Sequence, residues 1–232
     1  MLVGTRNPLN LGAAARAMSN FGALHMRVVN AYEPSFREAR SAVGPATEVL
    51  AGAEVFDSLA AAVSDCHLII GTTAIQQREL KQPVYRLDEA AGQIRQQLGI
   101  GRVAIVFGSE KTGLSNHALS YCHWLLHVPT RSEHRSMNLG QSVAVTLYEL
   151  SRDVLLVSPT ENRNGVSATS EDLERLADVL LDVLRLSGYT LPATLGATEE
   201  KVRRMVRRMG LNSRDAEVLV GMLRQIEWKL KE

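Results

Sequence analysis

The chain has 232 residues, which is enough for one well-packed core or for a core with a small second domain. Apolar residues make up 45% of it and charged residues 22%, as in an ordinary globular enzyme, and the formal net charge of +1 argues neither for nor against a nucleic acid partner. Two cysteines, Cys66 and Cys122, exclude a disulfide framework, and no apolar run reaches the roughly 20 residues that cross a bilayer. We therefore expect a soluble, cytoplasmic protein without a signal peptide.

Short strands and helices are predicted to alternate along the first 158 residues. Apolar and β-branched segments indicate strands at residues 2–3, 26–29, 54–56, 68–71 and 103–107. Helical patterns lie between the strands, at residues 11–20, 45–50, 58–64 and 88–98, and Asn10 is in position to cap the first helix. Strands that alternate with helices indicate crossover connections and a parallel sheet. Residues 1–158 are therefore predicted to form one α/β domain.

Two of the predicted strands lead into small and polar residues, at 71–73 and at 108–110. Open α/β sheets bind their ligands at the carboxyl ends of strands, and small residues there let a ligand approach the backbone. Ser136, Asn138 and Gln141 form a second polar cluster, just ahead of a long apolar helix. We predict that the two clusters form one small-molecule site.

Several familiar ligand motifs are absent from this region. Residues 108–113 are followed by Leu114 where a phosphate-binding P-loop needs lysine, and no strand leads into the G-x-G-x-x-G of a dinucleotide site. The histidines and cysteines lack the spacing of a metal site, so no metal is expected. Helix capping alone explains Asn138 about as well as catalysis does.

The pattern changes after residue 158. Residues 159–170 are poor in apolar residues and rich in turn formers, which predicts a linker. Residues 171–232 show three amphipathic helical patterns and are predicted to form a small all-helical domain, with helix caps at Thr198 and Ser213. The second of these helices carries Arg203, Arg204, Arg207 and Arg208. Either this is a solvated helix face, or the arginines form a stripe that binds the phosphates of an RNA.

Three stretches resemble the motifs of the SPOUT class of S-adenosylmethionine-dependent RNA methyltransferases. Residues 7–16, N-P-x-N-x-G-x-x-x-R, resemble the first motif of its ribose-methylating, TrmH-like branch. Residues 106–114, V-F-G-S-E-x-x-G-L, resemble the second motif, and residues 136–145, S-M-N-L-G-Q-S-V-A-V, resemble the third. The likeness extends over nearly the whole chain. It is greatest to the TrmJ type, which methylates the ribose 2'-hydroxyl at nucleotide 32 of the tRNA anticodon loop.

This resemblance implies a fold that the residue pattern could not predict, a parallel α/β sheet whose C-terminal part threads a trefoil knot. It also implies a homodimer with the active site near the interface, tRNA as substrate and S-adenosyl-L-methionine as methyl donor. The residues that it implies for cofactor binding are Thr72, Thr73, Ala74, Gly108, Val128, Arg135, Ser136 and Met137. Those that it implies for catalysis are Asn10, Arg16, Glu110, Ser136 and Asn138.

Arg16 holds the position that family proposals make the general base. An arginine gives up its proton only above about pH 12, which is far from physiological pH. We therefore expect Arg16 to anchor the target phosphate and to polarise the hydroxyl, with the identity of the proton acceptor left open.

Two other functions remain as alternatives, a ribosomal RNA ribose methyltransferase of the same class and a non-catalytic RNA-binding relative. The sequence does not distinguish cytidine from uridine as the target. Only Met1, Leu2 and Val3 remain where the family has a full first strand, so we expect either a misassigned start codon or a shortened strand.

Overall fold

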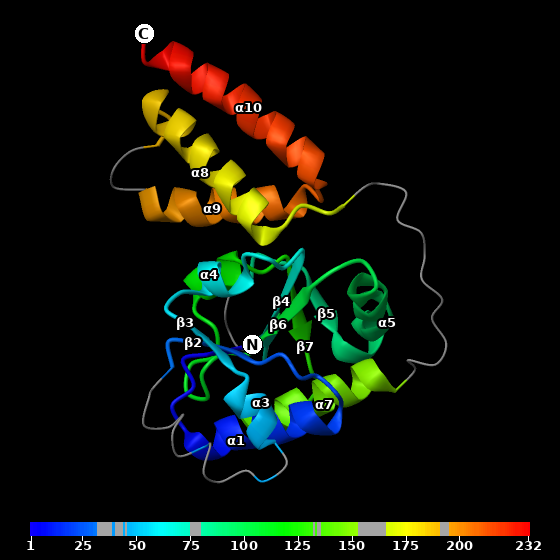
Figure 1. The fold of residues 1–232 in the computed structure, drawn as a ribbon. Helices are drawn as coiled ribbons and strands as arrows, with labels where there is room; N and C mark the ends of the chain where they lie inside the picture. The colour runs from blue at the N-terminus through cyan, green and yellow to red at the C-terminus, as the bar shows by residue number, and fades with distance from the viewer. Residues whose placement is uncertain are drawn as a thin grey trace.

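The computed structural model describes residues 1–31, 39, 44, 46–74, 80–131, 133, 136–152, 166–190 and 195–232. These residues form a parallel α/β domain and a bundle of helices that packs against one side of it (Figure 1). The parallel sheet and the separate helical bundle confirm the predicted architecture in its main lines. None of the described helices is long and apolar enough to cross a membrane.

All described strands run parallel. One sheet has the order β1-β2-β3 and consists of β1 (Leu2–Val3), β2 (Arg27–Val29) and β3 (Glu54–Phe56). The other has the order β5-β7-β4-β6 and consists of β4 (Leu68–Thr73), β5 (Val84–Arg86), β6 (Val103–Val106) and β7 (Trp124–His127). A bridge between Leu2 and Phe107 joins the two sheets, and the Val3 nitrogen lies 2.9 Å from the Phe107 oxygen. The strands thus form one continuous parallel array.

Helices cover both faces of this array. They are α1 (Pro8–Asn20), α3 (Thr47–Ala51), α4 (Leu59–Val63), α5 (Leu87–Leu98), α6 (Asn116–Ser120) and α7 (Leu139–Ser151). Ile69 packs among residues of α4 and α6, whereas its neighbour Ile70 packs among residues of α5. Successive side chains of a strand point to opposite faces, so β4 is buried on both sides.

Helices α1 and α7 lie side by side at the end of the domain opposite the bundle (Figure 1). They approach closely at Gly140, where an added β-carbon would lie 2.5 Å from the β-carbon of Ala13. Real β-carbons do not come this close, so a glycine at 140 is required for the contact. The first and third motifs are therefore held together directly.

The structure corrects several predicted boundaries. Helix α1 begins at Pro8 rather than at Leu11, and Asn7 caps it by accepting a hydrogen bond of 2.9 Å from the Leu9 nitrogen. Proline suits the first helical turn because its missing N–H would have no partner there. The prediction that Asn10 caps this helix is therefore wrong. Strands β5 and β7 were not predicted, because short runs without alternation cannot be told from helix or loop by periodicity.

The C-terminal bundle consists of α8 (Ser170–Leu186), α9 (Leu195–Arg208) and α10 (Ser213–Leu230) around an apolar core of its own. Thr169 and Asp172 form a capping box at the start of α8. Helix α9 begins before Thr198, and Asn212 caps α10, so the caps predicted at Thr198 and Ser213 are wrong. Most of the predicted linker, residues 159–165, lies outside the described residues.

Candidate functional site

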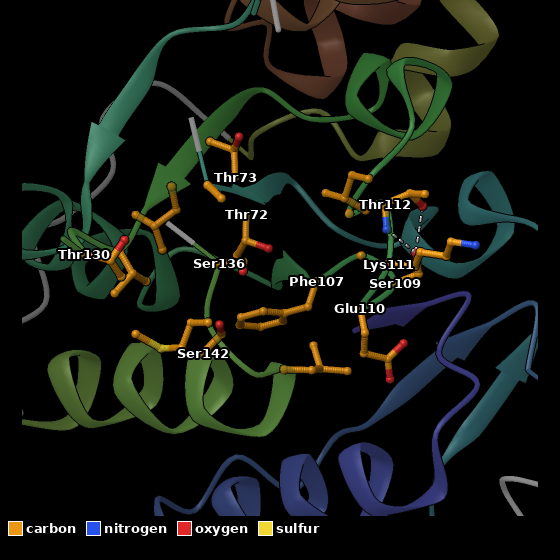
Figure 2. A pocket seen from close by; sticks show the side chains of 18 of the residues that line it. Thr72, Thr73, Phe107, Ser109, Glu110, Lys111, Thr112, Thr130, Ser136 and Ser142 are labelled. Carbon is orange, nitrogen blue, oxygen red and sulfur yellow. Dashed lines mark hydrogen bonds between the residues drawn. The ribbon is translucent and has the colours of Figure 1, made fainter. Parts of the chain in front are cut away.

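A cavity of about 280 Å³ lies where β4, β6 and β7 end, beside the start of α7 (Figure 2). Its volume is close to the lower end of the range for small-molecule sites, about 300 Å³. Eight of the predicted site residues line it, namely Thr72, Thr73, Ala74, Gly108, Glu110, Val128, Ser136 and Met137. Residues of the first polar cluster and Ser136 of the second therefore lie at one cavity, which Asn138 and Gln141 do not line.

The strand register explains why these segments meet. Gly71 of β4 pairs with Val106 of β6, and Thr73 of β4 pairs with His127 of β7, so the three strands end at the same level. The Thr72 hydroxyl donates a hydrogen bond of 3.1 Å to the Val106 oxygen, which fixes the end of β4 against β6. Figure 2 shows Thr72, Thr73 and Ser136 around the cavity, with Phe107 between them and the loop after β6.

The loop after β6 closes on itself tightly. The Gly113 nitrogen donates to the Ser109 oxygen at 2.9 Å, and the Ser109 and Thr112 hydroxyls are hydrogen-bonded at 2.9 Å. A β-carbon at Gly108 would lie 2.2 Å from the carbonyl carbon of Gly113, and Gly113 itself has a φ of +66°. The loop therefore requires glycine at both positions. It carries Glu110 at the rim of the cavity.

Three predicted catalytic residues form one chain of hydrogen bonds. The Asn138 side-chain oxygen accepts from the Gly140 and Gln141 nitrogens and caps α7. Its amide nitrogen donates to the Asn10 side-chain oxygen at 2.7 Å, and the Asn10 amide donates to a Glu110 carboxylate oxygen at 3.0 Å. The start of α7 is thus linked through two amides to the carboxylate at the cavity rim.

Of the other two predicted catalytic residues, Ser136 lines the cavity, and Arg16 does not join this chain. It is exposed on α1 and is not among the residues that line the cavity. It lies six positions after Asn10, which corresponds to roughly 9 Å along the helix axis. Arg16 shares an exposed face of α1 with Leu9 and Ala13.

Two of the four arginines predicted to bind RNA are buried. Arg203 and Arg207 form ion pairs with the two carboxylate oxygens of Glu174, at 2.8 and 3.0 Å, and their side chains are 10% and 1% exposed. Burial lowers the pKa of Arg207 from its ordinary value, although Glu174 opposes this shift. These two side chains are not placed to contact phosphates, so the predicted stripe is corrected: Arg204 pairs with Glu200 and only Arg208 is exposed.

The cavity is also lined by residues that were not predicted to bind the cofactor or to act in catalysis, although Ser109 belongs to the polar segment 108–110. They are Phe107, Ser109, Lys111, Thr112, Gly113, Leu114, Leu119, Leu126, Thr130, Leu139 and Ser142. Leu126 belongs to β7 and Thr130 follows it, so recognition of that strand would have indicated both. Arg135, predicted to bind the cofactor, lies outside the described residues.

The cavity residues fit a ligand such as S-adenosylmethionine, which has apolar and polar parts. Leu114, Leu119, Leu126 and Val128 supply apolar surface, and Thr72, Thr73, Thr130, Ser136 and Ser142 supply hydroxyl groups. Gly108 and Ala74 place no large side chain between the ligand and the backbone. Within the described part of the chain, no three His, Cys, Asp or Glu side chains gather as a metal site would need.

Comparison with known proteins places the chain in a family. Residues 1–148 match the model of the SpoU rRNA Methylase family. Two tRNA (cytidine/uridine-2'-O-)-methyltransferases TrmJ are similar to this chain. The one from Sodalis glossinidius is 32% identical over 98% of this chain and 90% of its own length. The one from Photorhabdus laumondii is 33% identical over 100% of this chain and 97% of its own length. The crystal structure of TrmJ from Z. mobilis ZM4 matches with a TM-score of 0.82 at 30% identity, over 97% of each chain. The protein therefore belongs to the SpoU methylase family.

Proposed function

We propose that the protein transfers a methyl group from S-adenosyl-L-methionine to a ribose 2'-hydroxyl of tRNA, at nucleotide 32 of the anticodon loop. The observation that carries this proposal is that the second and third motifs line one cavity, to whose rim the first motif is hydrogen-bonded. Residues of the second and third motifs line the cavity, and a hydrogen bond from Asn10 to Glu110 connects the first motif to the second. The target nucleotide follows the resemblance to the TrmJ type.

When bound, S-adenosyl-L-methionine supplies an electrophilic methyl group on a sulfonium. We assign its binding to Thr72, Thr73, Ala74, Gly108, Val128, Arg135, Ser136 and Met137, of which the described residues line the cavity. The attacking hydroxyl needs alignment and loss of its proton. The chain of Asn138, Asn10 and Glu110 holds a carboxylate in a fixed place at the rim, and we assign it to positioning of the ribose. Arg16 would anchor the phosphate.

The extent of the matches favours tRNA over ribosomal RNA. The family model covers residues 1–148, a region that ends before the helical bundle. The TrmJ relatives match nearly the whole chain, so their likeness includes the bundle. We therefore propose a catalytic domain at 1–158, a linker that begins at 159, and a tRNA-binding helical domain that begins at Thr169, the cap of α8, rather than at 171. Arg208, exposed on α9, would contact phosphate.

We also propose a homodimer built on α1 and α7. These two packed helices expose apolar side chains, Leu9 at 74%, Val145 at 39% and Tyr148 at 54%. Exposed apolar residues that gather on one surface are typical of an interface. Arg16 lies on the exposed face of α1, so in the dimer Arg16 of one copy would lie at the site of the other copy. The trefoil knot stays a prediction, which the insertion of β7 between β4 and β5 supports.

Labelled S-adenosylmethionine, unmodified tRNA and unmodified ribosomal RNA test the proposed activity. We expect label in tRNA, at the ribose of nucleotide 32 when the product is mapped by mass spectrometry. The Glu110→Ala variant, which removes the carboxylate at the rim, is the matched control and should transfer far less label. Label in ribosomal RNA alone would favour the first alternative function. No transfer to either RNA, with RNA binding intact, would favour the non-catalytic one.

A further inference from the structure

The helical bundle docks on the α/β domain close to the cavity. The first turn of α8 makes two backbone hydrogen bonds to the segment between α4 and β4, from Ser170 to Cys66 at 2.8 Å and from Glu171 to Ser64 at 2.9 Å. A second contact joins α9 to the end of α6. Figure 1 shows α8 and α9 as the helices of the bundle that face the α/β domain.

Two buried arginines form this second contact. The guanidinium carbons of Arg203 and Arg207 lie 4.4 and 5.3 Å from the centre of the Tyr121 ring, within the range of a cation–π interaction. Arg203 also donates to the Ser120 hydroxyl at 3.2 Å. We name Ser120, Tyr121, Glu174, Arg203 and Arg207 the Tyr121 cluster. It contains side chains from α6, α8 and α9 and the residue that follows α6.

Glu174 holds the two arginines in place. Each of its carboxylate oxygens pairs with one guanidinium, and Arg207 donates in addition to the Ser170 hydroxyl at 3.2 Å. Charges as buried as these are stable only with such partners, because each has lost its hydration. Planar guanidinium groups can pair with a carboxylate and stack on a ring at the same time, which a lysine cannot do.

The Tyr121 cluster adjoins the wall of the cavity. Leu119, which lines the cavity, precedes Ser120 directly in α6. The Leu119 oxygen accepts hydrogen bonds from the Gln82 side chain at 2.6 Å and from the Cys122 nitrogen at 2.9 Å. Cys122 and Leu114 also pack tightly against β4, because a β-carbon at Gly71 would lie 2.7 Å from the Cys122 sulfur and 3.2 Å from Leu114. A shift of Tyr121 would therefore disturb its neighbour Cys122, which packs against Gly71 and is hydrogen-bonded to the Leu119 oxygen.

We propose that Arg203 and Arg207 are positioning residues that act through Tyr121 and Ser120 to fix the Leu119 wall of the cavity. Docking of the bundle and binding of the cofactor would then favour each other. This inference rests on the proposed function for the identity of the ligand. It differs from the predicted RNA contact, since these two arginines serve the cofactor site from inside the protein.

The pair Tyr121→Leu and Tyr121→Phe tests the proposal in the full-length protein. Leucine removes the ring on which the arginines stack, whereas phenylalanine keeps it. The probe is S-adenosylhomocysteine, and its dissociation constant is measured by calorimetry without RNA. We expect an increase of about fivefold or more for Tyr121→Leu, the lower end of typical couplings between sites, and less than twofold for Tyr121→Phe. Arg203→Lys, which keeps a charge beside Glu174, should behave like Tyr121→Leu.

Two further measurements separate positioning from a merely structural role. Arg208→Ser, exposed on the same helix, should leave the affinity for S-adenosylhomocysteine unchanged and weaken tRNA binding. Tyr121→Leu should weaken the binding of S-adenosylhomocysteine and leave the affinity for tRNA unchanged. Hydrogen exchange should be faster in residues 118–122 of Tyr121→Leu than of Tyr121→Phe. Because coupling between sites is reciprocal, S-adenosylhomocysteine should slow exchange in α9 of the unchanged protein.

Failure of this proposal can be told from failure of the proposed function. If the unchanged protein binds S-adenosylhomocysteine and the Tyr121→Leu and Arg203→Lys variants bind it equally well, the positioning role is wrong and the function stands. If the unchanged protein does not bind it, the proposed function is wrong. In that case hydrogen exchange in residues 118–122 still tests whether the Tyr121 cluster holds this segment in place. Equal exchange rates in the Tyr121→Leu and Tyr121→Phe variants would show that it does not.

Discussion

The Asn138 amide nitrogen donates a hydrogen bond of 2.7 Å to the side-chain oxygen of Asn10, which lies 128 residues earlier in the chain. Through this bond the cap of α7 also positions Asn10, whose own amide reaches Glu110. One asparagine thus needs both its oxygen and its nitrogen, the oxygen for the helix and the nitrogen for the site.

Asn138→Asp should separate these two tasks. The carboxylate still accepts from the first turn of α7, so we expect the free energy of unfolding to stay within about 0.5 kcal/mol, whereas Asn138→Ala should lose about 1 kcal/mol. Both variants lose the donor to Asn10, so methyl transfer should fall by about tenfold or more, or roughly 1.4 kcal/mol. Urea denaturation and a methylation assay measure the two effects. Full activity in Asn138→Asp would show that the bond to Asn10 is dispensable.

Gly140→Ala should destabilise the protein by forcing α1 away from α7. Its β-carbon would lie 2.5 Å from that of Ala13, and such overpacking costs about 1–3 kcal/mol. Ala13→Gly alone should cost about 1 kcal/mol through helix propensity. In the double variant the clash is relieved, so the loss should be smaller than the sum of the single losses. Strictly additive losses in urea denaturation would contradict direct contact at this site.

His123 should make the fold sensitive to acid. Burial lowers its pKa from 6.5 to about 3, and its Nδ1 accepts a hydrogen bond of 3.1 Å from the Ile69 nitrogen, as only an unprotonated nitrogen can. Between those two pKa values the unfolded chain binds a proton and the folded chain does not. Stability is therefore full above pH 6.5 and falls as the pH drops toward 3, by up to about 1.4 kcal/mol per pH unit.

His123→Asn is the matched comparison for this effect, because its side-chain oxygen can accept the same hydrogen bond without titrating. Stability of the two proteins should be compared by urea denaturation at several pH values between 7 and 4. The difference in unfolding free energy should change in favour of the variant as the pH falls. A constant difference would mean that His123 is protonated as easily in the folded protein as in the unfolded chain.

Arg208→Ser should reduce the salt dependence of tRNA binding. Each phosphate contact that is lost lowers the slope of log K against log salt by about 1. Lys229→Ser on α10, also exposed, serves as control and should leave the slope unchanged. Filter binding at several salt concentrations gives both slopes. If Arg208→Ser keeps the original slope, its helix face is simply solvated.

Mixed dimers should reveal which copy supplies Arg16. Arg16→Ala and Glu110→Ala should each be inactive as homodimers. If Arg16 acts in the partner's site, a heterodimer retains one intact site, so an equal mixture that exchanges subunits should regain about a quarter of the normal activity. Sedimentation confirms the dimer. No recovery after exchange would place Arg16 and Glu110 in the same protomer.

Much of the site could be predicted from local sequence. Segments 71–73 and 108–110 were assigned to strand ends because apolar runs lead into small residues there, and all of them except Gly71 line the cavity. Asn138 was predicted as a cap from its place before an apolar helix, and it is one. Such features depend on neighbours along the chain, which is why a single sequence reveals them.

Other features required contacts between distant segments. Asn10 has the side chain of a helix cap, but Pro8 starts the helix earlier and frees Asn10 for Glu110. Arg203 and Arg207 have the spacing of a basic surface, yet Glu174 and Tyr121 bury them. Sequence by itself determined the motifs, the alternation of strands and helices and the break before the bundle. Only the tertiary structure decided which polar side chains face water, because burial depends on packing between elements far apart in the chain.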